Sequence, residues 1–190
     1  MSLRLRLGLA ASLVLALALA ANVTANASGL SAPRGQERHC IAQAFKVGTP
    51  APAAAAEPRC FPTFAKAIEA ATGGAIQLAP NAGTQELRTA QRIRPSAQYV
   101  IGIDYWDANF TGSTFTWWVD NPNGCADGSR YWNNVIPPDW QNNISSASTW
   151  QGCNHFVHYE GIYLGGSAID CTCATMGVMN DKSNSEEWYQ

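Results

Sequence analysis

Two segments of this chain repeat one order of features: an aromatic residue, a glycine and then a polar run. Tyr105 is followed seven positions later by Gly112, and Tyr159 is followed seven positions later by Gly166. A run of six mostly polar residues comes after each pair, and a tryptophan stands within a few residues of the end of each run. The two polar runs are residues 141–146 and 180–185. Internal repetition in this order predicts two copies of one supersecondary unit.

On these residues the chain resembles the βγ-crystallin family, in particular its secreted bacterial and fungal members. In that family each motif folds its first hairpin over onto itself, so glycine is wanted at a position with positive φ. The aromatic ring packs beneath the fold, and the last serine of the polar run caps the hairpin with its hydroxyl. The resemblance covers about residues 97–190. It implies an all-β, two-motif Greek-key β-sandwich, with the two polar runs meeting at one end.

Local patterns in residues 97–190 predict the same fold class. All seven tryptophans lie in this part of the chain, and short β-prone runs alternate with clusters of Gly, Asn and Pro. The predicted strands are residues 99–103, 113–119, 155–159 and 161–164. Several short strands with such turn signals and no long helical period predict a sandwich or a Greek-key barrel.

The sequence of residues 28–96 predicts a small α/β appendage and a linker that precede the sandwich. We expect a disulfide to close the appendage. Residues 49–56 are rich in Ala and Pro and predict a linker or an irregular loop. Thr63 is a plausible N-cap for a short helix that ends at Gly73 and Gly74. Residues 75–78 predict a strand, and residues 84–92 predict a second helix. Such a piece is too small to be very stable by itself.

The first 27 residues predict a secretory signal peptide. Arg4 and Arg6 precede an apolar run at residues 7–21, and residues 25–27 read Ala-Asn-Ala, a pattern that signal peptidase accepts. The run is shorter than the roughly 20 residues that a transmembrane helix needs. We therefore expect an exported chain that begins near Ser28 and is not held in a membrane. An uncleaved N-terminal anchor is the alternative.

Six cysteines remain in the predicted mature chain, and an even number outside the cell favours disulfides. Cys40 and Cys60 flank the Ala/Pro-rich loop and are expected to close it. Cys171 and Cys173 are too near in sequence to bridge each other without strain. On a strand both would face one side, from which they could reach Cys125 and Cys153. The six cysteines are Cys40, Cys60, Cys125, Cys153, Cys171 and Cys173.

Charge separates the two parts of the chain. Residues 28–96 carry a net charge of +4, whereas residues 97–190 carry −8. An acidic C-terminal half is a poor partner for nucleic acid or for an anionic membrane surface. It suits a cation better, although a solvated acidic surface is the commoner reason for such a charge.

The resemblance also implies two calcium sites between the polar runs. One would use Asn143 and Ser145 from the first run with Asn180 from the second. The other would use Gln141 from the first run with Asn184 and the carbonyl of Lys182 from the second. Oxygen ligands, some of them neutral, are what Ca²⁺ accepts. Two residues depart from the family pattern: Gln141 is one methylene longer than the family's Asn or Asp, and Asn184 replaces a hydroxyl. The alternative is that both runs are structural turns that hold no ion.

The remaining signals leave several partners open. Secreted proteins of the resembled type include protease inhibitors and killer-toxin-like antimicrobials, and residues 120–130, held by Cys125, are the candidate inhibitory loop. Trp106 and one of Trp117 and Trp118 are expected to be exposed, which would suit a cell-wall or carbohydrate-binding module that recognises a polysaccharide.

We expect no enzyme activity. No nucleophile-elbow or papain-like signature is present, and neither Asp104 with Asp107 nor Glu160 makes a convincing glycosidase pair. The spacing Cys153-x-His155-x-x-His158 suggests zinc, but residues i and i+3 of a strand face opposite sides. The sequence therefore predicts a secreted binding or structural protein, with calcium as a possible ligand.

Overall fold

The computed structural model describes residues 37–50, 57–93 and 96–190, which belong to one compact unit. The predicted signal peptide and most of the predicted linker lie outside the described residues. Among the helices that the structure describes, none is both long enough and apolar enough to span a membrane.

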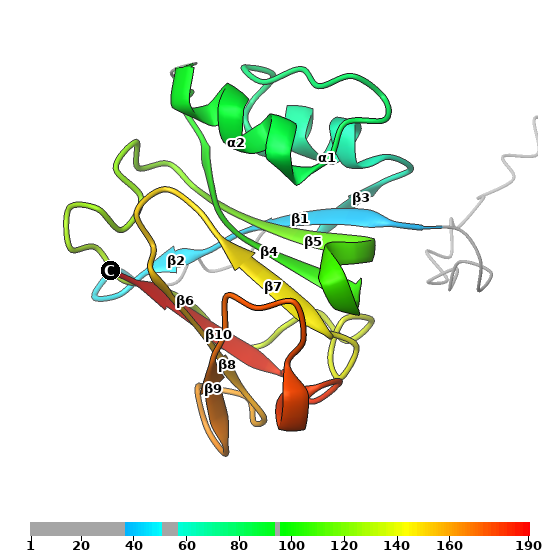
Figure 1. Cartoon of the computed structure of the whole chain (residues 1–190). Coiled ribbons are helices and arrows are strands. Elements are labelled where there is room, and N and C mark those ends of the chain that lie inside the picture. Colours follow the sequence, from blue (N-terminus) through cyan, green and yellow to red (C-terminus); the bar gives the residue numbers. More distant parts are fainter. Residues whose placement is uncertain (1–36, 51–56, 94–95) are drawn as a thin grey trace, which may run out of the picture. The chain divides into compact units, whose positions relative to one another are not determined.

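Two five-stranded sheets stack face to face (Figure 1). From edge to edge, the first sheet contains β3 (Arg59–Phe61), β1 (His39–Gln43), β5 (Thr111–Val119), β4 (Tyr99–Asp107) and β7 (Ser146–Thr149). The second contains β2 (Phe45–Lys46), β6 (Tyr131–Asn133), β10 (Ser185–Tyr189), β8 (His155–Tyr159) and β9 (Ala168–Asp170). Two short 3-10 helices, η1 (Ala108–Phe110) and η2 (Gly177–Met179), lie in the connections.

The connections make two Greek keys that exchange one strand each. In the first, β4 and β5 form a hairpin in the first sheet, β6 crosses to the second sheet, and β7 returns to pair with β4. In the second, β8 and β9 form a hairpin in the second sheet, and β10 returns to pair with β8. Between β9 and β10 the chain touches the first sheet, where Cys173 pairs with Ala147. The predicted two-motif Greek-key β-sandwich is therefore confirmed, and the fold is βγ-crystallin-like.

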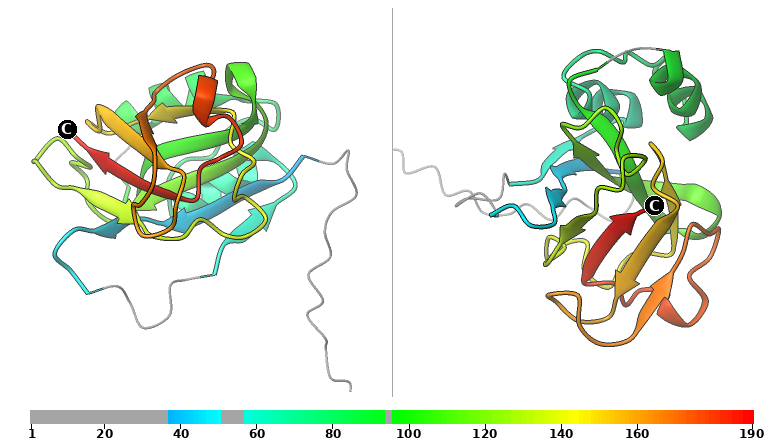
Figure 2. Two further views of the ribbon diagram at one scale, coloured as in Figure 1. Left: turned by 90° about the horizontal axis from the view of Figure 1, so that it is seen from below. Right: turned by 90° about the vertical axis from the view of Figure 1, so that its left-hand side faces the viewer.

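The N-terminal α/β portion is present and extends both sheets. Strand β1 pairs in parallel with β5, and β2 pairs antiparallel with β6. Helices α1 (Phe64–Ala71) and α2 (Thr84–Ile93) cover the outer face of the first sheet, as Figures 1 and 2 show. The change of composition at residue 97 marks no break in packing, because strands from before it continue both sheets.

Local capping rules account for the two helices. The Thr63 side chain accepts a hydrogen bond from the backbone N–H of Lys66, so the predicted N-cap of α1 is confirmed. Gly73 and Gly74 follow its end with positive φ, as predicted. The predicted strand at residues 161–164 is wrong, because that segment forms turns between β8 and β9, and the predicted strand at residues 75–78 is wrong as well. The latter segment is irregular and serves to return the chain from α1 to α2, with the Ile76 side chain buried beneath the helices.

The buried side chains form two layers. The inner layer lies between the sheets and includes the aromatic side chains of Phe115, Trp117, Trp140, Phe156 and Trp188. The outer layer lies between the first sheet and the helices and includes Ile68, Leu87, Val100, Ile103 and Trp150. Both faces of β4 and β5 are therefore covered.

This double cover corrects one expectation about the tryptophans. Trp117 and Trp118 do point to opposite faces of β5, but Trp118 packs against the outer layer instead of facing solvent. Trp106 is also half-buried and packs against Trp140. Among the tryptophans that the structure describes, none is fully exposed.

The cysteines lie in three close pairs, and one pairing differs from prediction. Cys40 and Cys60 face each other across β1 and β3, as predicted. The pairing of Cys171 and Cys173 with Cys125 and Cys153 is wrong, since Cys125 pairs with Cys153 and Cys171 with Cys173. The prediction assumed one strand through both residues, whereas β9 ends at Asp170. The Cα atoms of Cys171 and Cys173 are 5.1 Å apart, within the range that a disulfide spans.

Candidate functional site

Each Greek key begins with a hairpin that folds over onto itself, and the two hairpins have the same backbone geometry. In the first, φ is +61° at Asn109, +62° at Phe110 and +79° at Gly112. The residues at the same spacing in the second hairpin, Tyr163, Leu164 and Gly166, have φ values of +57°, +56° and +79°. The φ of +79° favours glycine at position 112, and a Cβ there would also displace the exposed Asp107 side chain, whose carboxylate oxygen would lie 2.3 Å away.

A serine from each polar run caps the matching hairpin. The Ser146 hydroxyl donates to the Asp107 carbonyl at 2.6 Å and accepts from the Phe110 N–H at 3.0 Å. The Ser185 hydroxyl donates to the Gly161 carbonyl at 2.6 Å and accepts from the Leu164 N–H at 2.9 Å. The predicted role of the last serine of each run is thus confirmed in both motifs.

These caps predict a matched pair of losses. Ser146→Ala and Ser185→Ala should each lower the free energy of unfolding by about 2 kcal/mol, because two backbone groups lose their partner in a poorly hydrated place. Ser167→Ala is the control, since Ser167 lies in the second hairpin with an exposed side chain. Urea denaturation of the three variants measures the difference. Equal stability of Ser185→Ala and Ser167→Ala would contradict the capping role.

The two polar runs meet at one end of the sandwich and are joined by paired hydrogen bonds. The N–H of Asp181 donates to the Ile144 carbonyl at 3.0 Å, and the N–H of Asn142 donates to the Ser183 carbonyl at 3.1 Å. In each case the second residue of one run binds the fourth residue of the other. Asn142 and Asp181 also share a positive φ, +58° and +55°. The runs are therefore related by an approximate twofold axis, as the resemblance implied.

Around Ser145 the junction gathers oxygen atoms. The Ser145 hydroxyl donates to one carboxylate oxygen of Asp181 in the other run at 3.2 Å. The Asn180 amide donates to the second oxygen of Asp181 at 2.7 Å, which leaves the Asn180 side-chain oxygen available as an acceptor. The Asn143 side chain turns back to the carbonyls of Asp139 and Gln141. This half of the junction combines one carboxylate with neutral oxygens, a ligand set of the kind that Ca²⁺ accepts.

Around Asn184 the equivalent place is filled by nitrogen. The Asn184 side-chain amide lies 3.1 Å from Asn142 Oδ1, 3.0 Å from the Lys182 carbonyl and 2.6 Å from the Glu160 carbonyl. An amide nitrogen has two protons to donate, so it satisfies two of these three oxygens, which a cation would otherwise bind. The Gln141 amide is directed elsewhere, to the Ile136 carbonyl at 2.7 Å.

The six predicted ligands therefore fall into two unlike groups. Ser145 and Asn180 are brought together with the carboxylate of Asp181, whereas Asn184 and the Lys182 carbonyl bind each other. Sequence reasoning did not include the second residue of each run, Asn142 and Asp181. The twofold pairing could have indicated them, because it places the second residue of one run beside the fifth residue of the other.

The predicted inhibitory loop at residues 120–130 is a compact series of turns. The Asn121 amide donates to the Gly124 carbonyl, to Asp127 and to the Tyr131 hydroxyl. Hydrogen bonds from Ser129 lower the pKa of the exposed Asp127 carboxyl to about 2. The loop is thus braced by its own side chains as well as by the disulfide at Cys125. A protease partner stays a prediction, as does a polysaccharide partner.

The sequence signal for zinc at Cys153, His155 and His158 separates in space. Cys153 is bonded to Cys125, His155 is at the surface beside Asp170, and His158 is fully buried. The two histidines face opposite sides of β8, which confirms the objection drawn from the strand period.

Comparison with known proteins identifies no family and returns a loose structural likeness. No protein-family model matches the chain, and no curated protein matches it. Among solved structures, a βγ-crystallin from an archaeon is similar to 48% of this chain over 98% of its own length, with 18% sequence identity and a TM-score of 0.32. A superposition this loose carries no argument by itself. The fold assignment depends on the doubled hairpins, caps and polar runs described above.

Proposed function

We propose that this chain is a secreted, non-enzymatic binding protein whose βγ-crystallin-like domain holds one calcium ion between its two polar runs. The ligands would be the Ser145 hydroxyl, the Asp181 carboxylate, the Asn180 side-chain oxygen and the Asn143 carbonyl. One observation carries the proposal. On one side of the twofold axis the Ser145 hydroxyl faces the Asp181 carboxylate, whereas on the other side the Asn184 amide faces the Asn142 amide. The ion would join segments that are far apart in sequence.

The same observation limits the proposal to one ion. Near Asn184 the amide protons already satisfy two of the three oxygens, so a second cation would have to displace an internal donor. With one carboxylate and otherwise neutral ligands, the dissociation constant should be on the order of 10⁻⁴ M, as in other extracellular modules. Calcium would then act as a stabiliser outside the cell, where it is abundant enough to fill such a site.

Calorimetric melting of the oxidised mature chain tests this proposal, first in EGTA and then in 10 mM Ca²⁺. At about 100 times the dissociation constant, binding adds about 2.7 kcal/mol to the free energy of unfolding. For a chain of this size the melting temperature should then rise by roughly 5–10 °C. Asp181→Asn should abolish the rise. An unchanged melting temperature in the wild type would show that both runs are structural turns.

The opposite half of the junction supplies the control. Asn142→Asp is the reverse substitution at the symmetry-equivalent position, the second residue of the first run. It should leave the calcium-dependent rise in melting temperature in place. Adding Asn184→Ser to it copies the Ser145 and Asp181 pair onto the other side of the axis. Titration calorimetry of that double variant should detect a second bound ion. A stoichiometry that stays the same would contradict the explanation based on the Asn184 amide.

A further inference from the structure

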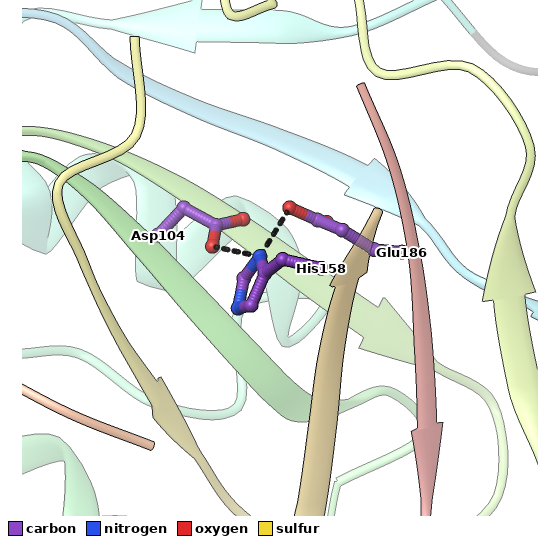
Figure 3. Close-up of side chains that lie close together, drawn as sticks. All are labelled: Asp104, His158 and Glu186. Atoms are coloured by element: carbon purple, nitrogen blue, oxygen red, sulfur yellow. Dashed lines mark ion pairs between the residues drawn. The ribbon is translucent and has the colours of Figure 1, made fainter. Parts of the chain in front are cut away.

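Three ionisable side chains meet between the two sheets, next to Ser183 of the second polar run. Asp104 lies on β4 of the first sheet, and His158 and Glu186 lie on β8 and β10 of the second. Figure 3 shows the three side chains directed toward one another between the sheets. His158 Nδ1 is 3.2 Å from Glu186 Oε1 and 3.9 Å from Asp104 Oδ1. All three side chains are 0% exposed.

Most of the polar atoms in this cluster lack a hydrogen-bond partner. Oδ1 of Asp104, both carboxylate oxygens of Glu186 and Nε2 of His158 are buried without one. Two atoms have partners: Oδ2 of Asp104 accepts from the Trp117 indole N–H at 2.7 Å, and Nδ1 of His158 lies 3.4 Å from the Ser183 hydroxyl. Buried polar groups are nearly always paired, so several orphaned atoms in one place indicate that a partner belongs there.

Charge gives the sign of that partner. In the described part of the chain, no lysine or arginine forms an ion pair with Asp104 or Glu186. Asp104 and Glu186 are acidic side chains with no solvent exposure, and burying a carboxylate is costly unless a charge of the opposite sign lies beside it. A divalent cation would balance both carboxylates.

We propose that Asp104, His158 and Glu186 form an internal site for one zinc-type divalent ion that joins the two sheets. The candidate donor atoms lie within 4.8 Å of one another. Donors about 2.1 Å from a tetrahedral zinc ion lie roughly 3.4 Å apart, so only small side-chain movements are needed. One imidazole and two carboxylates suit a transition ion, whereas Ca²⁺ requires six to eight oxygen ligands. The Trp117 indole orients Asp104, as outer-shell donors do around metal ligands.

Complete burial has a consequence for loading. The donors come from three strands of two sheets and are closed off from solvent, so the ion must enter while the chain folds. It would stabilise the native state by holding the sheets together. It would also exchange slowly once folding is complete. This site is independent of the calcium proposal, because it uses other residues and another class of metal.

Refolding tests the proposal directly. The oxidised mature chain is unfolded in guanidinium chloride, refolded with one equivalent of Zn²⁺ or with no metal, separated from loose metal by gel filtration, and assayed for zinc by atomic spectroscopy. We expect about one zinc per chain after refolding with the metal and a higher melting temperature than for the metal-free chain. Zinc added to the folded, metal-free chain should not be taken up. A wild-type chain without zinc would overturn the proposal and leave a protonated cluster instead.

Two isosteric variants complete the test. Glu186→Gln removes a ligand and a buried charge together, so it should still fold and should retain no zinc. Asp170→Asn makes the same kind of change in the surface pair of His155 and Asp170, and it should retain as much zinc as the wild type. Zinc that is lost in Asp170→Asn but kept in Glu186→Gln would assign the metal to the surface pair and overturn the internal site.

Discussion

A fragment limited to residues 97–190 should show no cooperative unfolding transition at 25 °C, whereas the mature chain should unfold cooperatively. The fragment contains both Greek keys and every residue of the proposed calcium junction. It lacks β1, β2 and both helices, and so loses the outer layer of burial. Circular dichroism during urea denaturation, together with light scattering, compares the two chains.

The size of the expected loss of stability follows from the burial of four side chains. Val100, Ile103, Tyr105 and Trp150 lie beneath the helices and are 0–5% exposed. Fully burying side chains of this size stabilises a fold by about 1.5–3 kcal/mol each. Their sum is of the same order as the 5–15 kcal/mol of net stability typical of a whole domain. Strand β5 would also become an unprotected edge once β1 is removed, which promotes aggregation.

A fragment with two substitutions distinguishes the loss of helical cover from the exposure of β5 as an edge strand. Val100→Thr and Ile103→Thr make the outer face of β4 more polar and keep the β-branched shape that suits a strand. If the lost helical cover is the cause, the substituted fragment should be more soluble and should regain a cooperative transition. A fragment with the native residues that unfolds as cooperatively as the mature chain would show instead that residues 28–96 contribute little to stability.

The parts of this fold that could be predicted from sequence are those set by local rules. The glycine of each folded hairpin is favoured by a positive φ that is set within eight residues, and the capping serine ends a polar run three or four positions before a tryptophan. The N-cap at Thr63 and the two glycines after α1 follow the same kind of rule. Such signals depend only on neighbours in the chain, so a single sequence is enough to find them.

The parts that could not be predicted depend on contacts between distant segments. The cysteine pairing was wrong because it assumed one strand through Cys171 and Cys173, whereas β9 ends at Asp170. The cluster of Asp104, His158 and Glu186 draws on three strands, and no spacing in the sequence connects them. One signal was available: residues 99–105 are apolar at almost every position, which is typical of a strand covered on both faces. A single aspartate inside such a run indicates a buried acid that needs a partner.

Gly102→Ala should lower the free energy of unfolding by about 3 kcal/mol, at the upper end of what one added carbon in a packed core produces. Gly102 lies on β4 opposite the second sheet, and a Cβ there would be 2.3 Å from Nε1 of Trp188 and 3.2 Å from Phe156. Trp188 is completely buried and also packs against Trp117, with ring centroids 5.3 Å apart. The indole therefore has no free space into which it can move.

Gly83→Ala is the matched control for this substitution. The nearest atom to a Cβ at Gly83 is a carboxylate oxygen of Glu86 at 3.7 Å, an ordinary contact at an exposed helix start. That variant should lose at most about 1 kcal/mol, because Gly83 is the N-cap of α2 and alanine caps a helix less well than glycine. Guanidinium denaturation followed by tryptophan fluorescence reports both variants. If Gly102→Ala and Gly83→Ala unfold at the same midpoint, the sheets can separate at Trp188 at little cost, and the inner layer does not fix their spacing.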